Sequence, residues 1–343
     1  MIAARSSPRG NTALPLFRLA GIAALLGLML GPGAAAAYAV ERLTTYLPAE
    51  PSKLAARSLV LDVAAAGERL VAVGAFGHVL LSDDYGASWR QAESVPTQVT
   101  LTAVTFIDAL HGWAVGHDAV IIHTEDGGLT WSVQYSDLDF GNPLLTILFL
   151  DETHGLAMGA LGHVLETRNG GRRWDERQLR RADVVDLNLN KLLAIGGTLY
   201  VASEFGIVYR STDGGASFAP VQSPSTAAFW NAIALPGGAL VFMGSDGALW
   251  RASASLQSWS RLDVPAGLRF LAGTALPDNR FVLVGGAANP GHDGAVAFGD
   301  SADAKLTVLR RPGAGRYTAA ASGPRGAIVL GGEKGLSLIA DRP

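Results

Sequence analysis

The sequence contains no cysteine among its 343 residues. Disulfide bonds, thiolate catalysis and cysteine-ligated zinc are therefore excluded. Charged residues are also scarce, at 17% of the chain, and the formal net charge is -3. A protein that binds nucleic acid through its phosphates needs a basic surface, so we expect no nucleic-acid partner. Hydrophobic residues make up 49% of the chain, which indicates a folded protein with a large core.

Acidic residues are absent from residues 1–39, and this segment has the features of a secretory signal peptide. Three arginines provide positive charge, residues 19–30 are apolar, and the small-residue site Ala37-Tyr38-Ala39 follows. The apolar run is short for a membrane span, and no later stretch is long and apolar enough to be one. We therefore expect a cleaved leader and a periplasmic or secreted product that does not span the membrane. An uncleaved anchor is the alternative.

One phrase recurs along the rest of the chain. A short apolar strand ends in glycine, a tight turn and a second strand follow, and a polar hairpin is closed by an aromatic residue. Successive closing aromatics are 41 to 44 residues apart, and they are Trp89, Trp131, Trp174, Phe218 and Trp259. Four short strands in about 43 residues are typical of one blade of a β-propeller.

The hairpin carries the pattern Ser/Thr-x-Asp-x-Gly-x-x-Trp in four copies. We expect the Asp or Asn side chain to accept backbone N–H bonds and the glycine to adopt a positive φ. The aromatic ring should bury a large area against the neighbouring unit. The four boxes are Ser82, Asp84, Gly86 and Trp89; Thr124, Asp126, Gly128 and Trp131; Thr167, Asn169, Gly171 and Trp174; and Ser211, Asp213, Gly215 and Phe218. A fifth copy keeps only Trp259, and the later units have lost the box.

The length of the repeat predicts the number of blades. Residues 40–343 contain about seven such units, and the seventh ends after its third strand, near residues 336–340. Residues 40–45 form the only spare strand, and pairing of both termini would remove two exposed sheet edges. We predict a signal peptide over residues 1–39 and one domain over residues 40–343. That domain is an all-β, seven-bladed β-propeller of four-stranded antiparallel blades, closed by the N-terminal strand and monomeric.

The four boxes resemble the Asp-box, or BNR, repeat of bacterial neuraminidases and sortilin-type receptors. Residues 43–342 look like one branch of this group, the photosystem II assembly and stability factor family. The resemblance depends on Gly-Trp-Ala-Val-Gly at residues 112–116 and Asp-Gly-Gly-Leu-Thr-Trp at residues 126–131. It implies a non-enzymatic periplasmic or lumenal propeller that binds membrane protein subunits during assembly. The partner would be a protein, either a subunit of a membrane complex or a transporter.

A carbohydrate-active propeller, either a sialidase-like hydrolase or a lectin, is the alternative. A sialidase needs an arginine cluster, a Tyr–Glu pair and an acidic Asp, and its Phe/Tyr-Arg-Ile-Pro segment is missing before the first box. Asp62, Asp108 and Asp151 fit turn positions better than a catalytic pair. His78 and His163 occupy the same place in two repeats, without metal-ligand spacing. We therefore predict no catalytic residue, metal or cofactor.

Two segments are candidates for partner binding. Five arginines gather around Trp174 although the chain is acidic, and guanidinium groups suit carboxylates and phosphates. They are Arg172, Arg173, Arg177, Arg180 and Arg181. A solvated outer strand is the competing interpretation. Phe229 and Trp230 form the second candidate, because adjacent side chains of a strand point to opposite faces and cannot share one core.

The first prediction concerns export. We expect cleavage after Ala39, because the small-residue site ends there and the charged, apolar and small segments occur in the usual order. N-terminal sequencing of the protein from its native envelope should give Val40 as the first residue. A full-length product in the cytoplasm would contradict the assignment.

Overall fold

The structure is a computed structural model, and it describes residues 47–138, 141–179, 187–276, 279–288, 293–302, 305–323 and 327–339. These residues belong to one compact unit, Tyr46–Pro343. The predicted signal peptide, its cleavage site and the predicted strand 40–45 lie outside the described residues.

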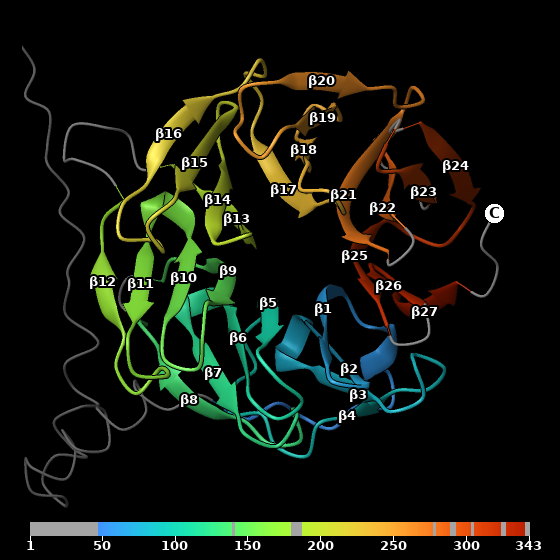
Figure 1. Cartoon of the computed structure of the whole chain (residues 1–343). Helices are drawn as coiled ribbons and strands as arrows, with labels where there is room; N and C mark the ends of the chain where they lie inside the picture. Colours follow the sequence, from blue (N-terminus) through green and yellow to red (C-terminus); the bar gives the residue numbers. More distant parts are fainter. Residues whose placement is uncertain are drawn as a thin grey trace, which may run out of the picture. The chain divides into compact units, whose positions relative to one another are not determined.

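The described residues form seven antiparallel sheets arranged in a ring, so the predicted seven-bladed propeller is confirmed (Figure 1). In each sheet the strands follow chain order from the centre outward. Blades 1 to 4 are β1 Val60–Ala66, β2 Arg69–Gly74, β3 Val79–Ser82 and β4 Arg90–Gln91; β5 Leu101–Phe106, β6 Gly112–Gly116, β7 Ile121–Thr124 and β8 Ser132–Tyr135; β9 Leu144–Phe149, β10 Gly155–Gly159, β11 Val164–Thr167 and β12 Asp175–Arg177; and β13 Leu189–Ile195, β14 Thr198–Ser203, β15 Ile207–Ser211 and β16 Ala219–Gln222. Blades 5 to 7 are β17 Phe229–Ala234, β18 Leu240–Gly244, β19 Leu249–Ala252 and β20 Trp259–Leu262; β21 Leu268–Ala275, β22 Arg280–Ala287, β23 Gly294–Asp300 and β24 Leu306–Arg311; and β25 Tyr317–Ser322, β26 Ile328–Gly332 and β27 Gly335–Ile339.

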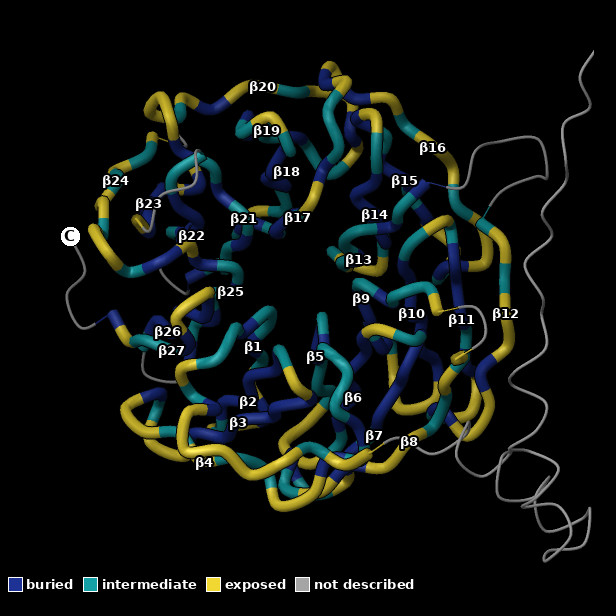
Figure 2. Tube along the Cα trace, turned by 180° about the vertical axis from the view of Figure 1, so that it is seen from behind, coloured by how far each residue is buried: buried dark blue, intermediate teal, exposed yellow. Residues whose placement is uncertain are grey.

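Burial is greater in the second strand of a blade than in the innermost strand, and it is least in the outermost strand of the four-stranded blades. The second strand is almost continuously apolar and buried on both faces, as in β6 and β10, because a blade lies against each side of it. The outermost strand is largely exposed, as in β12 and β16 (Figure 2). The short apolar runs of the sequence are therefore middle strands, and the polar hairpins are at the outside of the ring.

The hydrophobic core consists of layers between blades. Buried side chains form seven clusters, and each cluster joins two neighbouring blades. Trp131 of blade 2, for example, packs with Val71 and Leu81 of blade 1. Each closing aromatic lies in the layer shared with the preceding blade, so its ring contributes area where the sequence analysis expected it.

Each Asp-box is a turn held by its own side chains. In blade 2, the Thr124 hydroxyl oxygen accepts the Gly128 N–H at 2.9 Å, and the Asp126 carboxylate accepts the Thr130 N–H at 2.9 Å. The Trp131 indole N–H donates to the Gly128 carbonyl at 2.9 Å. The glycine has a positive φ in all four boxes, from 82° to 94°. The other boxes repeat the first two bonds, with Asn169 replacing the carboxylate in blade 3.

The innermost strand of every blade contains a β-bulge, at its second residue in six blades and at its fourth residue in blade 6. The bulge residues are Leu61, Thr102, Leu145, Asn190, Trp230, Leu271 and Thr318. A bulge turns side chains out of the normal alternation and toward the neighbouring blade. Asn190 donates its amide to the Phe229 carbonyl of blade 5 at 2.9 Å. The Thr102 hydroxyl donates in the same way to the Leu144 carbonyl of blade 3.

The residue after the bulge makes the equivalent bond in three other blades. The Asp62 carboxylate accepts the Val104 N–H at 3.0 Å, and the Thr146 hydroxyl oxygen accepts the Leu192 N–H at 3.0 Å. The Asn231 amide donates to the Leu271 carbonyl, also at 3.0 Å. These side-chain bonds cross five consecutive joints, from blade 1 to blade 6.

The ring closes between blades 7 and 1 through their innermost strands. The Thr318 hydroxyl of β25 donates to the Val60 carbonyl of β1, and a buried cluster that includes Ala319 and Val329 covers the joint. Blade 7 has three strands, β25 to β27, among the described residues. Its predicted fourth strand, residues 40–45, falls outside them and stays a prediction.

We predict that Thr318→Val weakens the closure. The variant leaves the buried Val60 carbonyl without its donor, which typically costs about 1–3 kcal/mol of the free energy of unfolding. Chemical denaturation should show this loss. Thr307→Val, at an exposed position of β24, is the control and should change stability little. Equal stability of Thr318→Val and the wild type would show that the bond does not hold the joint.

Candidate partner-binding surfaces

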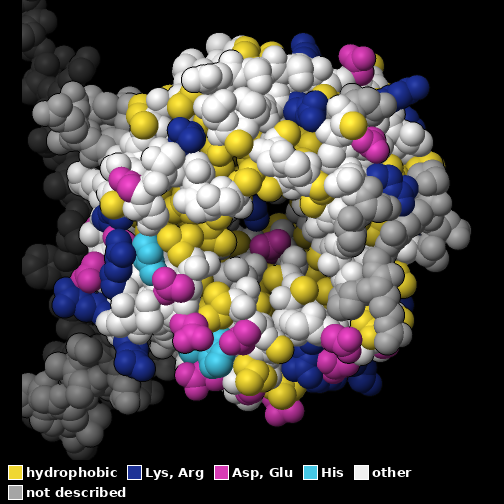
Figure 3. Space-filling view, viewed as in Figure 1, with side chains coloured by type: hydrophobic (Ala, Val, Ile, Leu, Met, Phe, Trp, Pro, Cys, Tyr) yellow, Lys and Arg dark blue, Asp and Glu magenta, His cyan; other side chains and the backbone are white. Residues whose placement is uncertain are grey.

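The arginine cluster lies on the outer edge of blade 3. Lys and Arg side chains gather over β11 and β12 (Figure 3). Arg172 and Arg173 belong to the Asp-box turn, and both are exposed. Arg173 forms an ion pair with Asp175 at 2.6 Å, with 75% of its side chain still exposed. Such a pair contributes little to stability, so the guanidinium can exchange it for a ligand.

Arg177 has a different environment from its neighbours. One of its Nη atoms lies 2.7 Å from the Glu166 carboxylate, and the other donates to the Ala216 carbonyl of blade 4 at 2.6 Å. Its side chain is only 24% exposed. Burial raises the pKa of Glu166. The hydrogen bond and charge of Arg177 and the charge of Arg168 lower it by more, so the pKa lies below its usual value. Arg177 therefore holds two blades together. Arg180 and Arg181 lie outside the described residues.

The bond from Arg177 is one of five similar bonds that the described residues form near the outside of the ring. In each, a long side chain of one blade donates to a carbonyl in the outer turn of the next blade. The other four donors and acceptors are Arg69 to Gly127, Gln134 to Gly170, Tyr200 to Ala254, and Arg251 to Ser301, at 3.0, 3.2, 2.5 and 2.6 Å. Arginine in this chain thus has two roles, joining blades and facing solvent.

A groove of about 530 Å³ lies between blades 2 and 3, next to the exposed arginines. Two cations, Arg168 and Arg172, and two carboxylates, Glu125 and Glu152, line it. Its wall includes Trp113, which stacks on Phe149 of blade 3 and on His123. Burial lowers the pKa of His123, so this ring is neutral at neutral pH. Arg168 pairs with Glu166 but keeps 63% of its side chain exposed. The sequence analysis missed Arg168, because it occupies a variable position inside the third box, between Thr167 and Asn169, apart from the other arginines.

Phe229 and Trp230 point to opposite sides of β17, as their adjacency predicted. Phe229 is fully buried and packs on Phe242 and Trp259. Trp230 is 43% exposed and lines a central cavity of about 340 Å³. The ring is hollowed at its centre, with hydrophobic side chains around the opening (Figure 3). Trp230 and the arginine cluster are therefore separate candidates, one on an innermost strand and one on an outer edge.

The residues that line the central cavity bear on the carbohydrate-active alternative. The described lining contains one carboxylate, Asp62, and one cation, Lys191, and it contains no Arg, Tyr or Glu. The Asp62 oxygens accept the N–H groups of Val63 and Val104. Hydrolysis of a glycosidic bond ordinarily needs two carboxyl groups facing the sugar, and this lining provides one. Among the described residues, no group of three His, Asp or Glu side chains is arranged to hold a metal ion.

The fifth unit retains the box turn although its sequence has lost the motif. The Trp259 indole N–H donates to the Leu256 carbonyl at 2.8 Å, as Trp131 does to Gly128. Leu256 has φ 59°, although leucine rarely adopts this conformation. Only the position of the aromatic could have revealed this turn from sequence.

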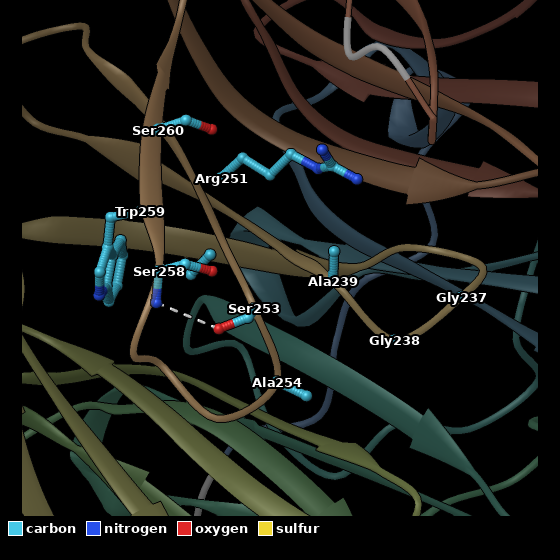
Figure 4. A pocket seen from close by; sticks show the side chains of 10 residues that line it. Gly237, Gly238, Ala239, Arg251, Ser253, Ala254, Ser258, Trp259 and Ser260 are labelled. Carbon is cyan, nitrogen blue, oxygen red and sulfur yellow. Dashed lines mark hydrogen bonds between the residues drawn. The ribbon is translucent and has the colours of Figure 1, made fainter.

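A cavity of about 360 Å³ lies beside this fifth turn (Figure 4). Ser258, Ser260 and Arg251 line it, while the Trp259 ring lies on the other side of the strand (Figure 4). Arg251 is committed to blade 6 through its bond to the Ser301 carbonyl. The cavity therefore offers mainly serine hydroxyls and backbone groups.

The fold defines a class, the seven-bladed propeller with Asp-box turns. The family model described as "Photosynthesis system II assembly factor YCF48" matches residues 81–142 and 133–322, which is more than half of the chain. The chain therefore belongs to this family, and the resemblance noted in the sequence is confirmed.

Individual relatives agree with this assignment. The chain is 36% identical over 190 residues to the photosystem II assembly protein Ycf48 of Synechococcus sp. (strain JA-3-3Ab). The alignment covers 53% of this chain and 56% of that relative, so it spans about half of each.

Two solved structures show the same fold. A structure described as "YCF48 bound to D1 peptide" matches with a TM-score of 0.67 and 19% identity, over 85% of this chain and 97% of that one. An ancestral GH74 enzyme matches with a TM-score of 0.63 and 14% identity, over 85% of this chain and 46% of that one. At these identities the matches establish the fold alone.

We predict that Arg177→Ala destabilises the protein and that Arg173→Ala does not. Loss of Arg177 removes one charge-assisted bond to Glu166 within blade 3 and one to the Ala216 carbonyl of blade 4, each typically contributing about 1.5–3 kcal/mol when partly buried. Loss of Arg173 removes one exposed pair, which contributes about 0–1 kcal/mol. Thermal and urea unfolding of both variants would measure the difference. Equal unfolding midpoints would show that Arg177 contributes as little to stability as the solvent-facing arginines do.

Proposed function

We propose that this chain is a non-catalytic, periplasmic or secreted binding protein that assists the assembly or stability of a membrane protein complex. The observation that carries the proposal is the set of exposed guanidinium groups on blade 3, beside a groove large enough for side chains of a partner. Membership of the assembly factor family supports the role. The relative bound to a D1 peptide supports a protein partner from a membrane complex.

Arg168, Arg172 and Arg173 form the partner surface in this proposal, and we name them the blade 3 arginines. Planar guanidinium groups bind carboxylates through two parallel hydrogen bonds, so an acidic segment of the partner fits them. The neighbouring acids Asp175 and Glu166 keep the arginines in place when the partner is absent. A segment that presents its own carboxylates would replace these weak surface pairs.

The groups that line the groove and the central cavity favour a binding function over a catalytic one. The groove contains carboxylates and imidazoles, but Glu125 and Glu152 share it with two arginines, and His123 stacks on Trp113. The central cavity contains one carboxylate that already accepts two backbone N–H groups. The central cavity thus has one carboxylate where glycoside hydrolysis ordinarily uses two, and the two carboxylates of the groove are exposed and share it with Arg168 and Arg172.

Reversal of two charges tests the blade 3 arginines. In Arg172→Glu/Arg173→Glu, binding of a fluorescently labelled D1 peptide should weaken by about tenfold or more, because two exposed cations become anions. Wild-type binding should also decrease as salt is added, since exposed charges are screened. Fluorescence anisotropy measures both effects, and mass spectrometry of co-purified envelope proteins extends the test to native partners.

A matched control separates local from overall charge. Arg310→Glu/Arg311→Glu makes the same change of net charge at the edge of blade 6, and it should leave binding unchanged. Unchanged binding by the blade 3 variant would show that these arginines belong to a solvated surface and do not bind the peptide. Equal weakening in both variants would show that overall charge, rather than this surface, attracts the peptide.

A further inference from the structure

Four blades have the same two-residue turn between their second and third strands. The turns are Phe76-Gly77, Asp118-Ala119, Leu161-Gly162 and Phe205-Gly206, and both residues of each have positive φ. This conformation is that of a type I′ hairpin turn, which favours Asn-Gly or Asp-Gly. Blade 2 follows the preference at its first position with Asp118. Blades 1, 3 and 4 contain phenylalanine or leucine instead.

The three apolar residues combine an unfavourable backbone conformation with an exposed apolar side chain. Phe76, Leu161 and Phe205 have φ of 61°, 53° and 54°, where side chains with a bulky Cβ substituent are strained. Their side chains are also exposed by 65%, 56% and 62%. Neither the backbone nor the core gains from a large apolar group here. Residues that break local rules without a gain in folding concentrate at functional sites.

The turns lie on one face of the ring. In blades 1 to 3 the residue that opens the turn donates its N–H to the carbonyl just before the innermost strand: Ala75 to Leu59, His117 to Thr100 and Ala160 to Pro143, each at 3.0 Å. Ser245 of blade 5 donates to Ala228 in the same way at 2.8 Å. This face is therefore the one where the innermost strands begin, and Trp230, second in β17, lies at the same end of its blade.

Charge distinguishes these four turns from the blade 3 arginines. The turn segments 75–77, 117–119, 160–162 and 204–206 contain Asp118 and Glu204 and no Lys or Arg. Acidic groups beside exposed apolar side chains repel anionic lipid headgroups and carboxylates, and they attract Lys and Arg. The matching ligand is a protein segment with both apolar and basic side chains.

We propose that Phe76, Leu161 and Phe205 form a second docking surface, for an apolar segment of a partner protein that carries Lys or Arg. Three anchors on blades 1, 3 and 4 suit an extended segment, which advances about 3.3 Å per residue. Exposed aromatic anchors commonly provide most of the binding energy of an interface. This surface is independent of the blade 3 arginines, so the protein can hold two chemically different segments of one partner.

Replacement of the three anchors by asparagine tests the proposal. Asparagine accepts the left-handed conformation better than phenylalanine or leucine, so Phe76→Asn/Leu161→Asn/Phe205→Asn should melt at the wild-type temperature or higher. A random dodecapeptide library panned on the wild type should yield sequences rich in apolar residues with Lys or Arg. Those peptides should bind the triple variant at least about tenfold more weakly.

Two controls make the result specific. Leu110→Asn removes an apolar side chain that is 52% exposed at a different turn, and it should keep peptide binding. Arg172→Glu/Arg173→Glu should also keep it, which separates this surface from the proposed acidic-segment site. Equal peptide binding by the triple variant, selection of acidic peptides, or binding of the wild type to phosphatidylglycerol vesicles that the triple variant loses would each overturn the proposal.

Discussion

The propeller depends on hydrogen bonds that pass from one blade to the next at its centre. Among the described residues the blades are separate sheets, and no backbone ladder joins one blade to the next. Hydrophobic layers bring two blades together, but apolar contact has no direction and does not fix how far one sheet slides along another. Side chains at or after the bulges do fix it, because each must meet one particular backbone group of the next blade.

A second set of bonds, near the outside of the ring, explains why similar residues have different roles. Arg69, Arg177 and Arg251 reach turn carbonyls of the next blade. Arg173, in the blade 3 turn, meets only a carboxylate of its own blade. The charge of an arginine therefore says little about its function here. An arginine joins two blades where a carbonyl of the neighbouring blade lies within its reach, and it faces solvent where none does.

Turn conformation is the third feature that organises the molecule. The Asp-boxes use glycine at positive φ and hold it with a hydroxyl and an Asp or Asn side chain of the same turn. The fifth turn keeps the same shape with Leu256, since Trp259 still anchors it. The turns at the other end of the strands also adopt positive φ, and three of them contain large apolar residues there. These positions combine a strained backbone with apolar side chains that are exposed to solvent.

The sequence alone determined the class of fold, because the box contains its own turn chemistry and the repeat length counts the blades. It also determined that Phe229 and Trp230 face opposite ways, since strand alternation is local. It could not separate Arg177 from Arg173, or add Arg168 to them, because these differences depend on distances to Ala216 of blade 4 and Glu166 of β11. Nor could it identify the exposed turn residues, since Phe76 in a Gly-rich apolar stretch has the sequence pattern of a core residue. Only the closed ring decided which side chains lie between blades and which face solvent, because burial there is produced by a neighbour distant in the chain.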